Sequence, residues 1–406
     1  MSSINVLGAL APFRVRSFRF QWPSDLLTSW AFEMETIILG WYILVETDSV
    51  LWLTLFGSLQ FLGTLLAPMF GVMSDRLGRR AMLCGMRAIY ALLACMIVTL
   101  SVAGLLNPIY VFIVAFVSGL IRPSDLVMRN ALIGDTIPTA QLSNAMGVSR
   151  TTLDSARVAG ALTGAGLFSQ LGMTYAYVAV VAVYAISFLL TFGVSKVRLT
   201  ALSETKTSPF RDLVRGLQYA YSVPLLQALL WLAFLVNLTA YPAIMGLMPY
   251  IAREIYHLDE NGLSHLVAAL AIGALLGSIF MILAGRAGAT GKAMVLGIVC
   301  WFVLLLIFAH VETKAWGIAL LVLIGFVQSI GMIAMSVTLL VTAEPSMRGR
   351  IMGVRMLAVY GLPIGLFAIS GIIDAIGFIG TISLYAVVGL MATGLTVFKW
   401  RREILS

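Results

Sequence analysis

GVMSDRLGRRAML, residues 71–83, interrupts one of the most apolar regions of the chain with Asp75, Arg76, Arg79 and Arg80. The flanking runs, LWLTLFGSLQFLGTLLAPMF before it and CGMRAIYALLACMIVTL after it, approach the roughly 20 apolar residues that a bilayer-crossing helix needs. Lipid gives backbone N–H and C=O groups no hydrogen-bond partner, so runs of this length must be helical. The stretch is therefore a predicted loop between two membrane-spanning helices.

The composition of the 406-residue chain points the same way. Hydrophobic residues make up 60% of it and charged residues only 11%, against roughly 25% charged residues in soluble proteins. The net charge of +8 comes from basic residues scattered through short loops, which argues against a nucleic-acid-binding surface. The three cysteines lie singly in apolar runs and form no CxxC pair. The composition predicts an all-α polytopic membrane protein.

Apolar runs bounded by charges, Gly and Pro predict twelve membrane-spanning helices in two sets of six. Their expected ranges are 23–45, 51–73, 81–104, 108–128, 143–169 and 173–195, followed by 224–249, 262–284, 292–310, 315–342, 350–375 and 378–398. Lys and Arg gather in the loops on one side of the membrane, and the opposite loops carry only Arg253 and Lys314. Because basic loops stay in the cytoplasm, both termini are expected there.

These spans divide the chain into two bundles and a linker. The expected parts are an N-terminal six-helix bundle (1–195), a cytoplasmic linker with an amphipathic helix (196–223) and a C-terminal six-helix bundle (224–406). The bundles share a weak repeat, because glycines in and just after the fifth span recur 205 residues later. The repeated pairs are Gly160 and Gly365, Gly166 and Gly371, and Gly172 and Gly377. Parallel repeats of this kind occur in transporters.

The opening stretch resembles the loop signature of the major facilitator superfamily: Gly, three residues, Asp-Arg, any residue, then Gly-Arg followed by Arg or Lys. The matching positions are Gly71, Asp75, Arg76, Gly78, Arg79 and Arg80. The resemblance implies two pseudo-symmetric six-helix bundles and secondary active transport of a small molecule by alternating access. It also implies a conformational latch. In that latch, Asp75 caps the eleventh span in one conformation and Arg79 pairs with an acid of the fourth span, here Asp125.

Two further stretches resemble the branch of the superfamily that includes bacterial drug and siderophore exporters. They are EMETIILGWYILVETDSVLWLTLFG (residues 33–57) and EPSMRGRIMGV (residues 344–354). This resemblance implies proton-coupled efflux of a small amphipathic molecule by a monomer in the bacterial cytoplasmic (inner) membrane. The fifth span lacks the proline of the antiporter signature, so an importer or a lipid flippase of the same fold stays an alternative. A transport-inactive membrane sensor is a third.

Glu33 and Glu35 place two carboxylates inside the first predicted span, where an ionisable group costs roughly 2.5–3.5 kcal/mol on insertion scales. At about 100° per residue they flank the polar face on its two sides, so they cannot share one site. Either of them, with Asp154 in the fifth span, is a candidate proton-coupling group. The alternative is a carboxylate permanently paired with an arginine of a neighbouring helix.

The fourth and fifth spans each carry a ladder of alternating charge. Its members are Arg122, Asp125 and Arg129 in the fourth span, and Arg150, Asp154 and Arg157 in the fifth. At this spacing each set shares one helix face. A charge relay or an anion-binding surface is one interpretation. We favour a network of interhelical ion pairs, because buried charges are commonly paired.

The second half offers mainly neutral polar and aromatic side chains to an amphipathic substrate. The candidate cavity residues are Asn237, Tyr241, Gln328, Arg355 and Tyr360. Motifs of hydrolases, metalloproteases and phosphate-binding loops are missing, so we expect no enzyme activity, no metal and no cofactor. The expected partners are a small-molecule substrate, protons and the lipid bilayer, with no nucleic acid. Arg87, in the third span, receives no predicted role.

Overall fold

The computed structural model describes residues 11–65, 70, 73–74, 77–195, 209–288, 290–344 and 347–404. Within these ranges the regular structure is entirely helical, which confirms the predicted all-α fold. The chain divides into two compact units. Unit 1 comprises Met1–Tyr42 and Leu62–Lys206, and unit 2 comprises Ile43–Phe61 and Thr207–Ser406.

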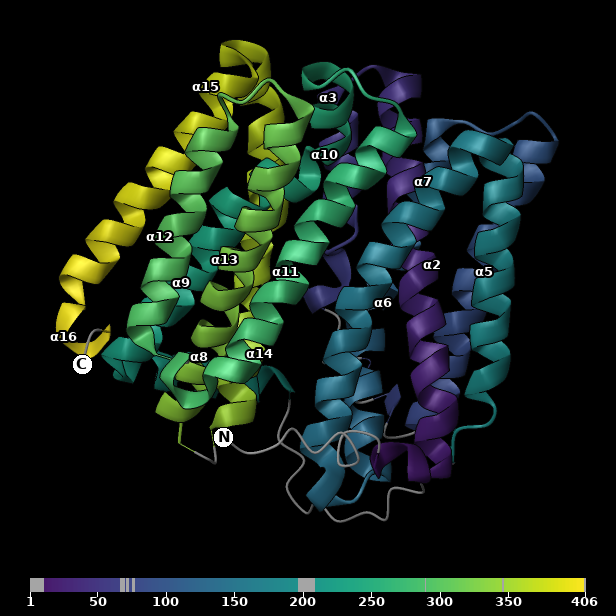
Figure 1. Cartoon of the computed structure of the whole chain (residues 1–406). Coiled ribbons are helices and arrows are strands. Elements are labelled where there is room, and N and C mark those ends of the chain that lie inside the picture. The colour runs from purple at the N-terminus through teal and green to yellow at the C-terminus, as the bar shows by residue number, and fades with distance from the viewer. Residues whose placement is uncertain are drawn as a thin grey trace. The chain divides into compact units, whose positions relative to one another are not determined.

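Unit 1 is a bundle of long helices (Figure 1). Its elements are η1 (Ala11–Arg14), most of α2 (Arg16–Thr47), η2 (Leu62–Leu65), α5 (Arg79–Val102), α6 (Pro108–Thr136) and α7 (Thr139–Thr191). The start of α6 follows from its local sequence. The side chain of Asn107 accepts a 2.9 Å hydrogen bond from the Ile109 N–H, and Pro108 occupies the first turn, where no N–H is needed. α5 packs along both α6 and α7.

Unit 2 holds the remaining helices. They are α3 (Val50–Leu59), α8 (Pro209–Ser222), α9 (Pro224–Tyr241), η3 (Pro242–Gly246), α10 (Met248–Tyr250), η4 (Ile251–Ile255), α11 (Glu260–Gly288), α12 (Gly291–Phe308), α13 (Lys314–Thr342), α14 (Arg348–Leu357), η5 (Ala358–Tyr360), α15 (Gly361–Lys399) and α16 (Arg401–Ile404). α11 packs along α13, and α15 packs along α9 and α12 (Figure 1). The helix predicted within the central linker is present as α8.

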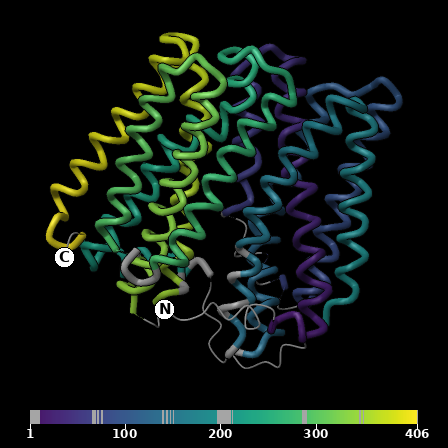
Figure 2. The backbone as a smooth tube through the Cα atoms, viewed as in Figure 1, coloured from purple at the N-terminus to yellow at the C-terminus, as the bar shows by residue number. Residues whose placement is uncertain are grey.

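Eight helices in the described part of the chain are long and apolar enough to cross a membrane. Two of the longest, α7 and α15, each contain one break. The breaks fall at Gly172, with φ 74° and ψ 179°, and at Gly377, with φ 70° and ψ 177°. Figure 2 shows the yellow C-terminal tube reversing direction within α15. The predicted boundaries between spans five and six and between spans eleven and twelve are confirmed, and the shared conformation 205 residues apart supports the repeat.

Replacing Gly172 or Gly377 with alanine should destabilise the protein by about 1–3 kcal/mol, because this backbone region is essentially restricted to glycine. No atom lies within 4 Å of an added Cβ at either position, so the cost comes from the backbone alone. Thermal unfolding of the purified variants measures it. The matched controls are Gly166→Ala and Gly371→Ala, which also meet open space but are helical, and should not lower the midpoint. Equal midpoints for all four variants would contradict the prediction.

Small residues let the helices of each unit approach closely, and the repeat extends to these contacts. A Cβ on Gly160 of α7 would lie 2.6 Å from the Glu33 Cβ of α2. A Cβ on Gly365 of α15 would lie 2.1 Å from the Leu238 carbonyl oxygen of α9. The fifth span thus packs on the first as the eleventh packs on the seventh, through the small-residue contacts typical of membrane helices.

Arg253 connects the segment Ile43–Phe61 to the rest of unit 2. Its guanidinium donates a 3.0 Å hydrogen bond to the Leu44 carbonyl and pairs with Asp48 at 2.9 Å. Asp48 has a positive φ of 47°, which turns the chain between α2 and α3 toward this arginine. One of the two basic residues on the predicted outer side therefore has a defined structural partner.

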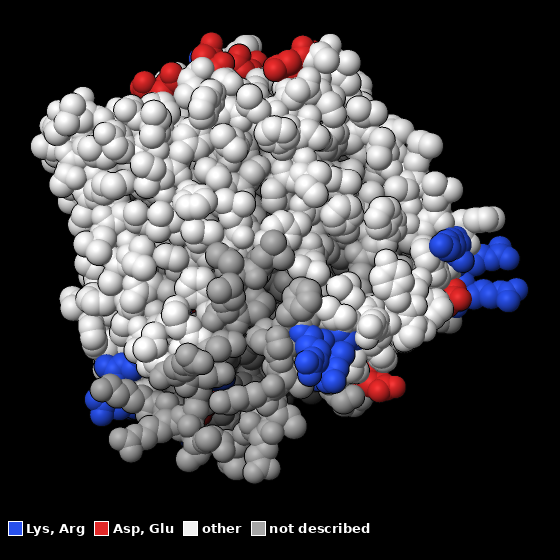
Figure 3. Space-filling view, turned by 180° about the vertical axis from the view of Figure 1, so that it is seen from behind, with Lys and Arg blue, Asp and Glu red and all other residues white. Residues whose placement is uncertain are grey.

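Charge is unevenly distributed over the surface. On the face drawn in Figure 3, most acidic side chains lie along one edge, Lys and Arg side chains with a few acids lie away from it, and a broad region without charge separates the two. Exposed acids of unit 2 lie near helix ends or, for Asp374, near the break in α15: Glu46, Glu254, Asp259, Glu312 and Asp374. An uncharged region beside a charged edge is typical of a protein that crosses a bilayer.

Candidate substrate and proton site

The first candidate site lies on α2. Within unit 1, one face of this helix is only partly covered by other residues. Between Thr28 and Trp41 the partly exposed residues are Ser29, Trp30, Glu33 and Thr36, and all others are buried. Their spacing of three to four residues places them on one side of the helix. Glu33 therefore faces outward from the packed interior of unit 1, and Glu35, roughly 200° around the helix, faces into it.

Glu33 lies between two arginines from different helices. Its Oε1 is 3.6 Å from Arg122 Nη2 on α6 and 3.7 Å from Arg157 Nε on α7. The side chains of Arg122, Arg157 and Glu33 are 35%, 29% and 16% exposed. Both distances exceed the roughly 2.7–2.9 Å of a tight charge-assisted hydrogen bond. The three residues, here called the Arg-Glu-Arg triad, form a loose and partly accessible ion-pair cluster.

Local packing holds this triad in place. The Arg122 Cζ stacks 3.1 Å from the centroid of the Phe32 ring, which is buried beside Glu33 on α2. Such cation–π stacking fixes the plane of a guanidinium group. Trp30 Nε1 donates a 2.7 Å hydrogen bond to Thr163 Oγ1 of α7, close to the contact that Gly160 makes with α2. The close approach of α2 and α7 brings Arg157 within reach of Glu33.

Glu35 has a different environment, because it is buried against the part of α7 that follows the break at Gly172. It accepts hydrogen bonds from Tyr184 Oη at 3.0 Å and from Tyr177 Oη at 3.3 Å, and it is only 5% exposed. Among the described residues it forms no ion pair. The two acids thus lie on opposite sides of α2, as their spacing predicted, and only Glu33 belongs to the triad.

A second charge network lies deeper in unit 1, centred on Asp25 of α2. Asp25 pairs with Arg87 of α5, and its Oδ1 is 3.6 Å from Arg129 Nε of α6. Arg129 also pairs with Asp125, four residues earlier on its own helix. All four side chains are less than 10% exposed. The predicted ladder of the fourth span is therefore split: Asp125 and Arg129 join this buried network, and Arg122 joins the triad.

Arg87 had no role predicted from the sequence. It is 0% exposed, and its guanidinium donates hydrogen bonds to Ser24 Oγ and Thr191 Oγ1 in addition to Asp25. The available signal was a single arginine in a third span that is otherwise uncharged, together with one acid near the start of the first span. The Arg87–Asp25 pair is a structural connection among α2, α5 and α7.

The loop signature can be described only in part, because Gly71, Asp75 and Arg76 lie outside the described residues. Gly78 has a positive φ of 87° and precedes α5. Arg79 donates to the Ala131 carbonyl at 3.0 Å and pairs with Asp135 of α6.

The expected partner of Arg79, Asp125, is therefore wrong for this conformation. Asp125 lies ten residues earlier on α6, about 15 Å along the helix axis, and there it pairs with Arg129. Arg80 donates to the Phe192 carbonyl at 2.5 Å instead of to an acid.

The fifth-span ladder is less complete in the structure. Asp154 is buried at 4% exposure, whereas Arg157 contacts Glu33 as a member of the triad. The side chain of Arg150 lies outside the described residues. A proton-coupling role for Asp154 and a network role for Arg150 stay predictions.

The predicted cavity residues of the second half all lie in unit 2. Asn237 is buried, and its amide donates 2.8 Å to the Ala233 carbonyl of its own helix. Tyr241 packs edge-on against Trp301, with ring centroids 5.0 Å apart. Gln328, Arg355 and Tyr360 are partly exposed on α13, α14 and η5. Their substrate-binding role stays a prediction.

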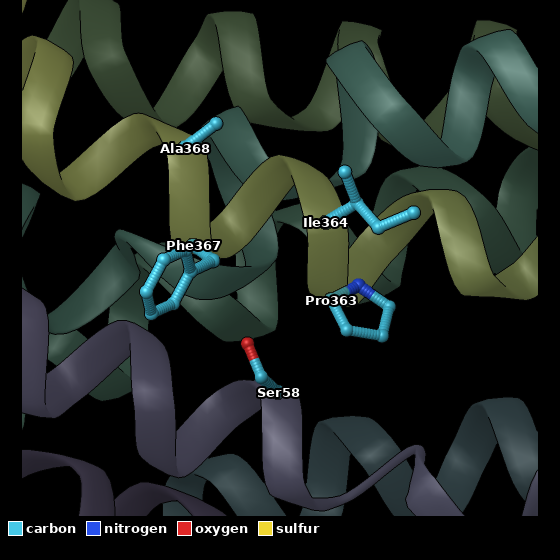
Figure 4. Close-up of a pocket in the computed structure, with 5 residues that line it drawn as sticks. All are labelled: Ser58, Pro363, Ile364, Phe367 and Ala368. Carbon is cyan, nitrogen blue, oxygen red and sulfur yellow. The ribbon is translucent and has the colours of Figure 1, made fainter.

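A cavity of about 450 Å³ in unit 2 lies between α3 and α15. Its lining, drawn in Figure 4, is Ser58, Pro363, Ile364, Phe367 and Ala368. The Ser58 hydroxyl donates 2.7 Å to the Thr54 carbonyl of its own helix, so the cavity offers mainly apolar surface. It contains none of the predicted site residues. In the described part of the chain, no group of three or more His, Cys, Asp or Glu side chains is placed to hold a metal ion.

Comparison with known proteins agrees with this architecture. The family model described as Major Facilitator Superfamily matches residues 26–368. A mutant form of the nucleoside transporter NupG has a TM-score of 0.72 at 15% identity, covering 93% of this chain and 99% of that one. The human organic anion transporter MFSD10 (TETRAN) has a TM-score of 0.65 at 16% identity, covering 94% and 99%.

A bacterial homologue of the human lysosomal transporter Spinster, in an inward-facing and unoccupied conformation, has a TM-score of 0.66 at 14% identity, covering 95% and 97%. A comparison with curated proteins finds no match. Identities this low show a shared fold alone, whereas the family model covers most of the chain. The chain belongs to the major facilitator superfamily, whose members are multi-pass membrane transporters.

Proposed function

We propose that the protein is a proton-coupled secondary active transporter of a small organic molecule, with Glu33 as the group that carries the proton. The observation that carries this proposal is the placement of Glu33, an intramembrane acid on the partly open face of α2 within 4 Å of two arginines. Ionisable residues kept inside a membrane span commonly mark ion or proton pathways. The named relatives move nucleosides and organic anions, which supports a small polar molecule as substrate.

Glu33 is favoured over Glu35 for two reasons. A coupling group must exchange its proton with water, and its interaction with a charged partner must change when it is protonated. Glu33 is partly exposed and has two cations whose interaction with it changes on protonation. Glu35 is enclosed by Tyr177 and Tyr184, an environment typical of a structural hydrogen-bond acceptor.

The remaining features of the proposal come from the sequence. We propose a monomer in the bacterial cytoplasmic membrane with both termini in the cytoplasm, which works by alternating access without catalysing a covalent reaction. Efflux is the direction expected from the resemblance to drug and siderophore exporters. Import and transport-inactive sensing are separate outcomes of the test below, and lipid flipping is an alternative that the test does not measure.

The proposal is tested with proteoliposomes that contain the full chain. Uptake of a panel of radiolabelled nucleosides and small carboxylates is measured with and without an imposed pH gradient, in both gradient directions. We expect at least one compound to move only with the gradient, and Glu33→Gln to abolish that response. The matched control is Glu35→Gln, since a glutamine can still accept from a tyrosine. Gradient-driven transport that survives unchanged in Glu33→Gln would rule out Glu33 as the coupling group.

A further inference from the structure

Resting on this proposed function, we infer that Arg122 and Arg157 bind the carboxylate of an aromatic organic anion, which takes the place of Glu33 between them once Glu33 is protonated. The substrate class is thus an aromatic monocarboxylate, and the substrate and the proton bind together.

The triad carries unequal charge. Two guanidinium groups share one carboxylate oxygen, so the cluster keeps one net positive charge inside a membrane span. Such a charge is costly in lipid unless an anion or water balances it. Partial exposure of both arginines makes the cluster accessible to a dissolved anion.

The geometry suits exchange of one carboxylate for another. Glu33 Oε1 lies 3.6 and 3.7 Å from the nearest atoms of the two arginines, which is longer than a tight hydrogen bond. A substrate carboxylate is free to move to closer, bidentate positions that Glu33, attached to the α2 backbone, does not occupy. Arginine favours carboxylate over neutral groups because its planar fork matches the two oxygens.

The neighbours select an aromatic substrate. Trp30 lies one turn from Glu33 on the same open face of α2 and is partly exposed, and its Nε1 is held by Thr163. Its ring therefore has a fixed position beside the triad. Aromatic rings pair well with other aromatic rings in offset or edge-on arrangements.

The charged and titratable groups that face Glu33 determine the sign of the coupling. Among the described residues, the charged groups within 4 Å of its carboxylate are Arg122 from α6 and Arg157 from α7. Glu35 and Tyr184 also interact electrostatically with Arg122, and the buried Asp154 lies one turn before Arg157 on α7. Arg87 of α5 faces Asp25 instead. Protonation removes the carboxylate that competes with the substrate for both arginines. The anion should therefore bind more tightly as the pH falls, and the triad keeps one net positive charge whether it is empty or loaded.

Proton and anion travel together, so an inward proton gradient drives uptake and the coupled step is electroneutral. Proton-driven efflux, expected from the exporter resemblance, would need the proton to displace the substrate. The triad favours the import alternative.

Binding is tested first, on the purified full chain in detergent without any gradient. The probes are benzoate, phenylacetate and indole-3-acetate, and each has its neutral amide as a matched control ligand. We expect the acids to raise the unfolding temperature more at mildly acidic than at neutral pH, and the amides to have no effect. Arg122→Gln and Arg157→Gln should lose the response, whereas Arg19→Gln, at an exposed arginine of α2, should keep it.

The variant Glu33→Gln distinguishes an anion-binding triad from a triad that has only a structural role. Glutamine imitates the protonated acid, so this variant should bind the anions at neutral pH as strongly as the wild type does at acidic pH. Loss of binding in Glu33→Gln, or equal stabilisation by acids and amides, would overturn the inference.

Transport then separates the inference from the proposed function. In proteoliposomes, a pH gradient should drive accumulation of the bound acid, and an imposed membrane potential alone should not. Gradient-driven transport of nucleosides without any binding of the acids would retain the proposed function and overturn the anion site. Binding of the acids without gradient-driven transport would retain the anion site and overturn the proposed function.

Discussion

Arg87→Met should destabilise the protein by about 3–5 kcal/mol, the usual cost of leaving one buried charge without its partner. Arg87 is completely buried and donates hydrogen bonds to Asp25, Ser24 and Thr191. Methionine has a similar length but no donor, so Asp25 would keep a charge inside unit 1 with the Gln21 amide at 3.3 Å and the more distant Arg129 beside it. A large fall in the unfolding temperature of the purified protein is the expected measurement.

Two comparison variants show whether this fall comes from the pair. Arg19→Met removes the same charge from an exposed position of α2 and should leave the unfolding temperature nearly unchanged. The double variant Asp25→Asn with Arg87→Met should recover part of the loss, because replacing both members of a buried pair is far less costly than removing one. If Arg87→Met unfolds at the same temperature as Arg19→Met, the structural role of the pair is refuted.

Gly325→Ala in α13 should lower the free energy of unfolding by about 1–3 kcal/mol or more, as expected for an overpacked contact. An added Cβ would lie 2.1 Å from the Leu270 carbonyl oxygen of α11. The contact is reciprocal, since a Cβ on Gly273 of α11 would lie 2.0 Å from the Val322 carbonyl oxygen of α13. Each obstacle is backbone, which no side-chain rotation relieves, so the two helices would have to separate.

The matched control for this substitution is Gly394→Ala in α15, where an added Cβ meets no atom within 4 Å. It should retain or raise the unfolding temperature, because alanine is the better helix former. Thermal unfolding of the two variants and the wild type in the same detergent gives the comparison. Equal midpoints would mean that α11 and α13 do not approach as closely as the structure describes.

The course of the chain was largely predictable from sequence because it depends on local properties. The length of an apolar run determines whether it crosses a membrane, and the predicted break after residue 169 coincides with the turn at Gly172. The repeat of Gly172 at Gly377 was visible as a spacing of 205 residues before either conformation was known. Helical periodicity also predicted that Glu33 and Glu35 would be separated.

Partnerships between helices were less predictable. The family resemblance implied a pair of Arg79 with Asp125, whereas the structure pairs Arg79 with Asp135 and Asp125 with Arg129. Both acids are on α6, and only the axial position of α5 relative to α6 selects between them. The same reason explains why Asp25 and Arg87 were not recognised as a pair, since they lie 62 residues apart on different helices.

The sequence by itself determined the all-helical membrane fold, the order of the spans, the turns between them and the presence of intramembrane charges. These properties follow from hydrophobicity, helical period and glycine geometry, which act over a few residues. Only the tertiary structure decided that Glu33 meets Arg122 and Arg157 while Glu35 meets two tyrosines. Those contacts depend on how far each helix slides and rotates against its neighbours, and close packing at residues such as Gly160 sets that position.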